Sequence, residues 1–272
     1  MMTASTSSVL QRKAVVLSKF LCRLQQAVQS REGQDAFLLF MGETSRLLAV
    51  LLELLKQSLS KIHHISRLSS QSAWIKALSP AMAKAAGRFQ TLAGFLDEWQ
   101  MINRMFGLLD VLVGTGKFLR EVRRRKKENL AVDRKDIALE GLQHVSMIFF
   151  HLSEGAACLA SKKILTLPSK RQNQLSFAAV RAWAVFTFLD LARGVIEYKK
   201  MTKRGDATSP KEQKEGGQDM QQWRSQFLIN LAWAPVTVHW GVDGGLLPDS
   251  LASLLAVYAT SGIFKDVWKR TI

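Results

Sequence analysis

An apolar stripe with helical spacing is the sequence feature that most constrains the fold of this chain. Between residues 78 and 106, apolar side chains recur at alternating steps of four and three residues, which brings them to one face of an α-helix. The stripe consists of Leu78, Met82, Ala85, Phe89, Leu92, Leu96, Trp99 and Phe106. Similar spacing continues along most of the chain, and only 5 of its 272 residues are proline. The sequence therefore predicts an all-α protein.

The helix that carries this stripe, expected at about residues 74–106, has an opposite face that is low in charge. Small and polar residues occupy that face, with basic residues at its flanks: Lys84, Gly87, Arg88, Thr91, Gly94, Glu98 and Arg104. Such a helix can pack inside an all-α core, or it can lie in the surface of a bilayer with its apolar side among the lipids. Periodicity alone does not separate these two environments.

Shifts in composition divide the chain into five regions. An N-terminal helical region at 1–122 contains the stripe and is followed by a basic loop that we expect at 123–136. Residues 137–198 predict a pair of apolar helices that charged side chains interrupt, so neither helix is expected to span a membrane cleanly. A flexible hydrophilic linker is predicted at 199–222, and a hydrophobic helical hairpin at 223–272.

The C-terminal hairpin is the part of the sequence that most favours contact with lipid. Residues 225–242 and 250–264 contain no Asp, Glu, Lys or Arg. A hairpin that enters the membrane would leave both of its ends on the same, cytosolic side. We assign Trp233, Pro235, Trp240 and Gly245 to this membrane hairpin, and we expect the two tryptophans to act as interfacial anchors. A helical hairpin packed in a soluble core is the alternative.

The net charge of the chain favours an anionic partner. Its 38 Lys and Arg residues exceed its 22 Asp and Glu residues, which gives a formal charge of +16 and attracts nucleic acid or an anionic membrane surface. Basic residues occupy every position of 123–127, but no aromatic side chains lie between them to stack on bases, so we interpret this run as a solvated connector. We therefore expect an anionic phospholipid membrane as the partner, and no nucleic acid.

No arrangement of residues predicts an enzyme, a cofactor or a metal site. The segment Gly114 to Lys117 is similar to a phosphate-binding loop, but Val111 replaces its first glycine and Phe118 replaces its serine or threonine. One helical face carries four possible metal ligands, which are Glu140, His144, His151 and Glu154. The first and the last of them lie about 20 Å apart along a helix, which is too far for one ion. No nucleophile or carboxylate pair has a recognisable catalytic context.

Three segments, in order along the chain, carry a family resemblance. The first is Arg31-Glu32-Gly33-Gln34-Asp35 with the leucine-rich helix that follows it. The second comprises Leu92, Asp97, Met101, Arg104, Phe106, Gly107 and Leu108. The third comprises Trp223, Asn230, Leu231, Ala232, Trp233, Pro235, His239, Trp240, Gly245, Leu246, Leu247 and Trp268. With these segments the chain resembles the peroxisomal biogenesis factor 11 family, particularly its divergent fungal members.

The resemblance implies a function and assigns residues to it. It implies a peroxisomal membrane protein that elongates and tubulates the membrane, promotes peroxisome proliferation and fission, associates with itself and meets the fission machinery. An amphipathic helix would enter the cytosolic leaflet as a wedge. The wedge would consist of Phe89, Leu92, Phe95, Leu96, Trp99 and Phe106, and lipid headgroups would be held by Lys84, Arg88 and Arg104.

Two other functions stay open at this point. A metabolite-permeable pore of the peroxisomal membrane, also suggested for this family, would need the helices that hold Glu140, His144, Arg181 and Asp190 to line water. A basic, soluble helical adaptor would need the C-terminal hairpin to be ordinary protein core. Ion conductance would distinguish the first, and release from membranes into alkaline carbonate would distinguish the second.

Overall fold

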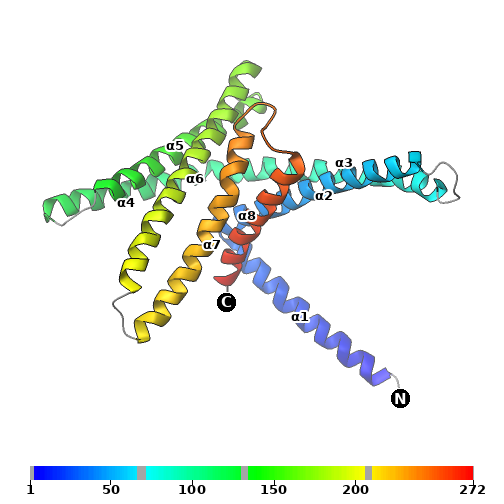
Figure 1. Cartoon of the computed structure of the whole chain (residues 1–272), viewed down its shortest axis with the longest axis horizontal. Coiled ribbons are helices and arrows are strands. Elements are labelled where there is room, and N and C mark those ends of the chain that lie inside the picture. Colours follow the sequence, from blue (N-terminus) through cyan, green and yellow to red (C-terminus); the bar gives the residue numbers. More distant parts are fainter. Residues whose placement is uncertain (1–2, 66–71, 130–133, 206–209, 272) are drawn as a thin grey trace.

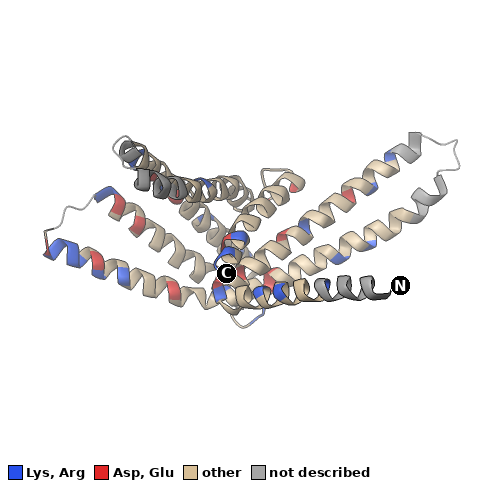
Figure 2. Cartoon of the chain, turned by 90° about the horizontal axis from the view of Figure 1, so that it is seen from below, with Lys and Arg blue, Asp and Glu red and all other residues tan. Residues whose placement is uncertain are grey.

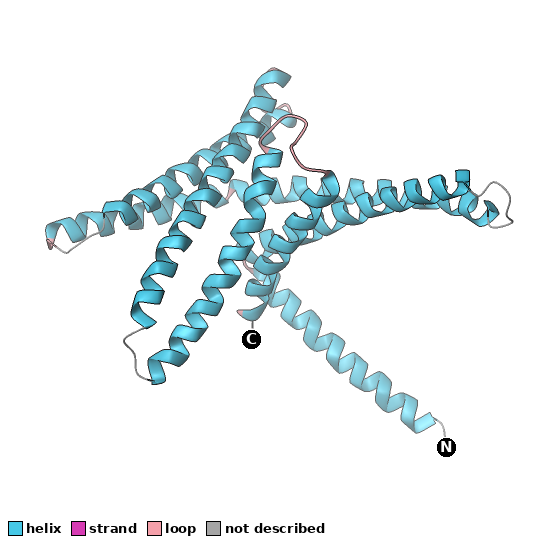
Figure 3. Cartoon of the chain, in the orientation of Figure 1, coloured by secondary structure: helices cyan, strands magenta, loops and turns pink. Residues whose placement is uncertain are grey.

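The computed structural model describes residues 3–65, 72–129, 134–205 and 210–271, and every regular element within them is an α-helix. The helices are α1 (Thr3–Gln29), α2 (Arg31–Ile65), α3 (Ser72–Met105), α4 (Gly107–Lys127), α5 (Arg134–Ser161), α6 (Ser169–Gly205), α7 (Pro210–Trp240) and α8 (Asp249–Lys269). The prediction of an all-α protein is confirmed. Figure 3 shows helix over nearly all of the described residues.

Long helices that pair with their chain neighbours extend outward from a common centre. In Figure 1, α2 and α3 run side by side in one direction, α4 and α5 run in the opposite direction, and α6 with α7 forms a third arm. Helix α1 leaves the centre by itself, and α8 lies at the centre against α2 and α7. The resulting molecule is spread out, so much of each helix faces away from protein.

The main hydrophobic core lies where α2, α7 and α8 meet. Its fully buried members are mostly small: Leu39, Ile229, Ala232, Trp233, Val236, Ala256 and Ala259. Small side chains let helices approach closely, and a Cβ added to Gly262 of α8 would lie only 2.6 Å from the Cδ1 atom of Ile229 in α7. The charge-free C-terminal segments therefore pack together as the centre of the fold.

Two regional predictions are wrong because charged segments proved to be helical. Residues 123–127, expected as a basic loop, form the last turn of α4, and residues 134–136 begin α5. The expected linker at 199–222 is also helical on both sides of 206–209, which lie outside the described residues. Lys, Arg, Glu and Gln are good helix formers, so a solvated, charged segment can continue a helix without a packed face.

Among the described residues, helix α6 is the candidate membrane span by length and composition. Over Ser169–Thr202 it is long and apolar enough to cross a bilayer, and only 17% of its most apolar stretch is buried. The sequence interpretation set this helix aside because of its charges. Two of them are satisfied within the protein, since Asp190 accepts hydrogen bonds from Gln143 and Asn230, and Arg181 donates one to the Gly241 carbonyl.

Candidate membrane-binding surface

A row of large apolar side chains is exposed along α3 and α4. Its members recur at steps of three and four residues and are Leu92, Phe95, Trp99, Ile102, Phe106, Leu109 and Val113. Their exposed fractions run from 40% for Leu92 to 64% for Phe106. At about 1.5 Å per helical residue, the row extends over about 30 Å. We call these seven residues the exposed stripe.

The opposite side of α3 explains why the exposed stripe has no protein partner. Helix α3 packs against α2 through a second set of side chains, which are Met82, Ala86, Ala93, Leu96 and Gln100. Helix α2 therefore covers one side of α3, and the exposed stripe lies on the other side, which α2 does not cover. An apolar surface of this length is unusual on a monomeric soluble protein and marks a site of contact with lipid or protein.

The structure exposes some residues of the predicted wedge and buries others. Leu92, Phe95, Trp99 and Phe106 are exposed, as a wedge requires, whereas Leu96 is 9% exposed and Phe89 is half-buried. Leu96 belongs to the contact with α2, so its assignment to the wedge is wrong. The spacing of four and three residues placed side chains from two faces of α3 in one predicted stripe. The position of α2 shows which of them are covered by protein and which are exposed.

Three members of the exposed stripe were missed by the sequence interpretation. Ile102 lies within the predicted helix, and Leu109 and Val113 continue the same spacing beyond its end at 106. Helix α4 begins at Gly107, directly after α3, so the stripe passes from one helix to the next. The unbroken spacing of apolar residues across Gly107 was the signal that could have revealed them.

The basic residues assigned to headgroups have different environments. Lys84 and Arg88 are exposed, and their side chains are free to reach a lipid surface. Arg104 is only 16% exposed at its side chain, because its guanidinium donates to the carboxylates of Asp35 at 3.3 Å and Glu154 at 2.8 Å. Arg104 joins α2, α3 and α5, so its assignment to headgroup binding is wrong.

Burial and charge act against each other within this ion pair. Burial would lower the pKa of Arg104, but the carboxylates of Glu154 and Asp35 raise it above its ordinary value. For Glu154, burial raises the pKa above the ordinary value, and Arg104 opposes that effect. The pair is therefore an internal link whose charges depend on each other, and removal of one partner would leave the other buried without compensation.

A second buried acid lies between α2 and α3. Glu43 is almost fully buried, one of its oxygens accepts from Arg46 at 2.7 Å, and its Oε2 atom has no partner among the described residues. Burial raises the pKa of Glu43 to about 7, while Arg46 acts in the opposite direction. Arg46 also binds Asp97 of α3. The Glu43 carboxyl therefore stays protonated to a higher pH than an exposed glutamate does.

The basic run at the end of α4 is exposed but partly neutralised. Residues 123–127 lie at the tip of the arm that α4 forms with α5, where Figure 2 shows basic and acidic residues together. Glu121 accepts from Arg124 at 2.8 Å and from Arg125 at 2.7 Å. Hydrogen bonds from Arg124 and Arg125 lower the pKa of Glu121 to about 2. The tip remains positive, with fewer uncompensated charges than the sequence alone indicates.

The predicted hairpin tryptophans do not occupy an exposed surface. Trp233 is 3% exposed, and the Trp183 ring of α6 lies 4.7 Å from the Trp233 ring and 6.1 Å from the half-buried Trp240 ring. Their assignment as interfacial anchors is therefore wrong, because the two rings fill the packing between α6 and α7. Pro235 lies inside α7 and is half-buried.

Gly245 has a structural role in the turn between α7 and α8. Its φ of 70° lies in the left-handed region, and an added Cβ would be 2.2 Å from the Cε1 atom of His239. The Nδ1 atom of His239 accepts hydrogen bonds from the backbone N–H groups of Leu246 at 2.8 Å and Leu247 at 3.0 Å. His239 and Gly245 together fix the path of the chain between the two helices.

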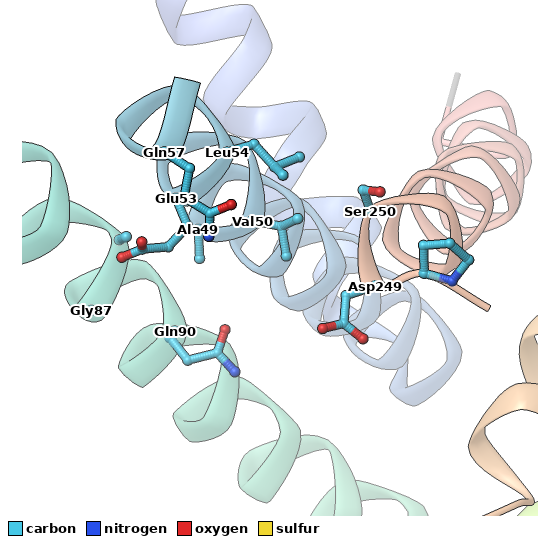
Figure 4. A pocket seen from close by; sticks show the side chains of 11 residues that line it. Ala49, Val50, Glu53, Leu54, Gln57, Gly87, Gln90, Asp249 and Ser250 are labelled. Atoms are coloured by element: carbon cyan, nitrogen blue, oxygen red, sulfur yellow. The ribbon is translucent and has the colours of Figure 1, made fainter. Parts of the chain in front are cut away.

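A separate open groove of about 550 Å³ lies between α2, α3 and the start of α8. Figure 4 shows Glu53, Gln57, Gln90 and Asp249 among its lining side chains. Glu53 is paired with Lys56 at 2.6 Å. Across the described ranges, no three His, Cys, Asp or Glu side chains gather in a way that could hold a metal ion. The absence of an enzymatic activity stays a prediction.

Comparison of the chain with known protein families, with curated proteins and with solved structures finds no match. The resemblance to the peroxisomal biogenesis factor 11 family therefore rests on the three sequence segments alone.

Proposed function

We propose that this chain binds the cytosolic face of an organelle membrane through the exposed stripe and bends that membrane. The observation that carries the proposal is the uncovered row from Leu92 to Val113. Complete transfer of one large apolar side chain out of water is worth about 1.5 to 3 kcal/mol, so transfer of the row supplies on the order of 10 kcal/mol before the costs of binding.

Insertion on one side of a bilayer supplies the force for curvature. An amphipathic helix lies in the interface with its apolar face buried about 5–10 Å. The inserted volume expands the outer leaflet more than the inner leaflet, and the bilayer relieves this difference by curving toward the protein. A row about 30 Å long, carried by two successive helices, acts as a linear wedge.

Electrostatic attraction supports the same arrangement. Lys84 and Arg88 are exposed near the start of the exposed stripe, and the whole chain has a formal charge of +16. Each Lys or Arg close to an anionic membrane surface contributes about 1 kcal/mol to binding. We infer that the protein prefers membranes that contain acidic phospholipids.

Other exposed apolar rows extend the proposed contact with lipid. Helix α5 carries Leu142, Val145, Phe149 and Leu152 at steps of three and four, all of them exposed. The candidate span α6 would enter the bilayer, and α7 with α8 would enter it as a hydrophobic hairpin through exposed side chains such as Leu228, Leu231, Leu254 and Tyr258. These elements would attach the protein firmly, and the exposed stripe would shape the membrane.

The organelle is proposed from the family resemblance. We propose the peroxisomal membrane, with both termini in the cytosol, and a role in peroxisome proliferation and fission through self-association. Imaging of the tagged chain with a peroxisomal membrane marker tests this assignment. Co-localisation, with fewer and larger peroxisomes on deletion, is expected, and a diffuse or nuclear signal would reject it.

The membrane-bending activity is tested with a matched pair of double variants. Phe95→Glu with Trp99→Glu adds two charges to the exposed stripe, and Gln90→Glu with Gly94→Glu adds the same charge to exposed positions on another face of α3. The first pair should abolish tubulation of acidic vesicles in electron micrographs, because charged side chains oppose insertion of the stripe, while the other lipid contacts keep the protein on the vesicles. Equal tubulation by both pairs would reject the wedge.

A further inference from the structure

The exposed stripe continues along α4 as a row of basic side chains. Beyond Val113, the same steps of four and three residues lead to Lys117, Arg120, Arg124 and Lys127, all of them exposed. At 3.6 residues per turn, these four residues share one face of α4 with Leu109 and Val113. We call the four residues the basic row. The face of α4 that carries the stripe is therefore apolar in its first half and basic in its second half.

Acidic neighbours neutralise only part of the basic row. Arg124 pairs with Glu121 at 2.8 Å and with Glu128 at 3.3 Å. Lys117, Arg120 and Lys127 form no ion pair with any described residue. Like charges three or four positions apart on a helix repel each other, and an anion that lies between them relieves this repulsion. The basic row is therefore suited to bind a surface that carries several negative charges.

A bilayer offers an apolar layer and a layer of phosphates in the same order as this face of α4. An amphipathic helix buries its apolar side about 5–10 Å into the boundary between headgroups and acyl chains. The basic row extends about 15 Å along the helix axis, so a modest inclination of α4 lifts it from that depth to the phosphates. The long side chains of Lys and Arg can also reach toward headgroups while their stems stay in apolar surroundings.

Nucleic acid is a poorer match for the same face. Its phosphates would attract the basic row, but nucleic acid has no apolar layer to cover Leu109 and Val113, which lie on the same line of α4. A surface that joins apolar and anionic groups explains both halves of the face at once.

We propose that the basic row binds the phosphate groups of acidic phospholipids in the leaflet that the exposed stripe enters, so that α4 begins in the apolar layer and ends on the headgroups. This inference rests on the proposed membrane binding and names the side chains that hold the phosphates. It gives a function to the charged end of α4, which the sequence interpretation took for a solvated connector. Figure 2 shows this end at the tip of its arm, away from the centre of the molecule.

Two pairs of substitutions that remove the same charge test the basic row. Lys117→Gln with Arg120→Gln removes two unpaired cations of the row. Arg125→Gln with Lys126→Gln removes two exposed cations from other sides of α4 and serves as the control. All four positions are exposed, so neither pair should unfold the chain. Circular dichroism checks that both variants keep their helix.

An environment-sensitive dye near the basic row reports its contact with a membrane. The dye is attached at Gly116→Cys, where a Cβ meets nothing within 4 Å, in the full chain with its two other cysteines replaced. The protein is reconstituted in vesicles of phosphatidylcholine with or without phosphatidylserine, to which the other lipid contacts keep it attached. We expect the emission to shift only where phosphatidylserine is present.

The two pairs should differ in this response. Removal of two cations from the basic row should weaken contact of the dye with acidic vesicles by about tenfold or more relative to the control pair, since each cation near an acidic surface strengthens binding several-fold. Equal responses of the two pairs would overturn the proposal. An equal response on phosphatidylcholine alone, or displacement of α4 from the vesicles by a short duplex RNA, would overturn it as well.

Insertion of the exposed stripe, measured separately, distinguishes failure of this inference from failure of the proposed function. If a label at Phe95→Cys lies in lipid while the two pairs respond alike, the basic row is wrong and the wedge remains. If that label stays in water, the proposed function fails and the inference with it.

Salt supplies a test that needs no change to the basic row. A higher ionic strength should release the dye at position 116 and leave the label at position 95 inserted, because salt screens charge contacts but does not weaken apolar ones. A dye response that does not depend on salt would overturn the proposal.

Discussion

The guanidinium of Arg104 in α3 lies 2.8 Å from the carboxylate of Glu154 in α5, and both side chains are about five-sixths buried, with 16% and 15% exposed. This ion pair, with Asp35 as its third member, ties the helix that carries the exposed stripe to the central helices. The arm formed by α2 and α3 therefore has a fixed attachment, although its outer face is uncovered. In the proposed function, this attachment would hold the exposed stripe against the bilayer.

Replacement of Arg104 separates a structural role from lipid binding. Arg104→Ala should lower the free energy of unfolding by about 3 kcal/mol, because it leaves two buried carboxylates without their cation. Arg88→Ala, at an exposed position of the same helix, should change stability by less than about 0.5 kcal/mol but weaken binding to acidic vesicles. Chemical unfolding and vesicle sedimentation measure the two effects. An Arg104→Ala variant of unchanged stability would contradict the ion-pair assignment.

The start of α4 should not tolerate a side chain. A Cβ at Gly107 would lie 2.8 Å from Cε1 of His151 and 3.0 Å from an Arg31 nitrogen, so Gly107→Ala should destabilise the protein by about 1–3 kcal/mol. Gly116→Ala in the same helix meets nothing within 4 Å and should be neutral or stabilising, since alanine favours helix. Thermal melting of the two variants gives the comparison, and equal melting temperatures would argue against this packing.

The turn between α7 and α8 provides a matched pair of glycines. Gly244 and Gly245 both have positive φ, but only Gly245 would bring a Cβ against His239. Alanine at position 244 should cost about 1 kcal/mol of backbone strain, and alanine at 245 should cost more because the histidine must also move. His239→Ala should reproduce the additional loss, since it removes the acceptor for two backbone N–H groups. Similar unfolding energies for the two glycine variants would contradict the His239 contact.

Glu43 should make stability depend on pH. Its pKa is raised by burial from 4.5 to about 7, so the folded state binds a proton that the unfolded state has released between these values. The free energy of unfolding should therefore fall as pH rises from about 4.5 to 7, by about 3 kcal/mol in total. Glu43→Gln should remove this slope. Urea unfolding at pH 5, 6 and 8 measures it, and a variant with the wild-type slope would show that another group is responsible.

The helices could be predicted from the sequence because helical spacing reports which side chains share a face. The long helices α3, α5 and α6 agree broadly with the predicted helix at 74–106 and the predicted helix pair at 137–198. The same spacing does not report what covers a face. Leu96 and Phe95 are adjacent and both apolar, yet Leu96 packs on α2 while Phe95 is exposed. Only the position of α2 decides between them.

Charge patterns were misleading for a related reason. Arg104 matched a headgroup-binding residue in sequence, but the two carboxylates that hold it come from α2 and α5, about 70 and 50 residues away. Trp233 matched an interfacial anchor until α6 brought Trp183 against it. Long-range contacts of this kind have no signal in local spacing, so the residues that bind lipid could be predicted only in part.

The depth of the exposed stripe in a bilayer tests the central claim most directly. A nitroxide label is placed at Phe95→Cys or at Gln90→Cys, in a chain whose two free cysteines, Cys22 and Cys158, are replaced. Electron paramagnetic resonance with oxygen and a water-soluble nickel complex then reports the depth of each label on acidic vesicles. The label at position 95 should lie about 5–10 Å below the headgroup phosphates, and the label at 90, on another face of α3, should remain in water. Equal access of the nickel complex to both labels would contradict insertion of the stripe.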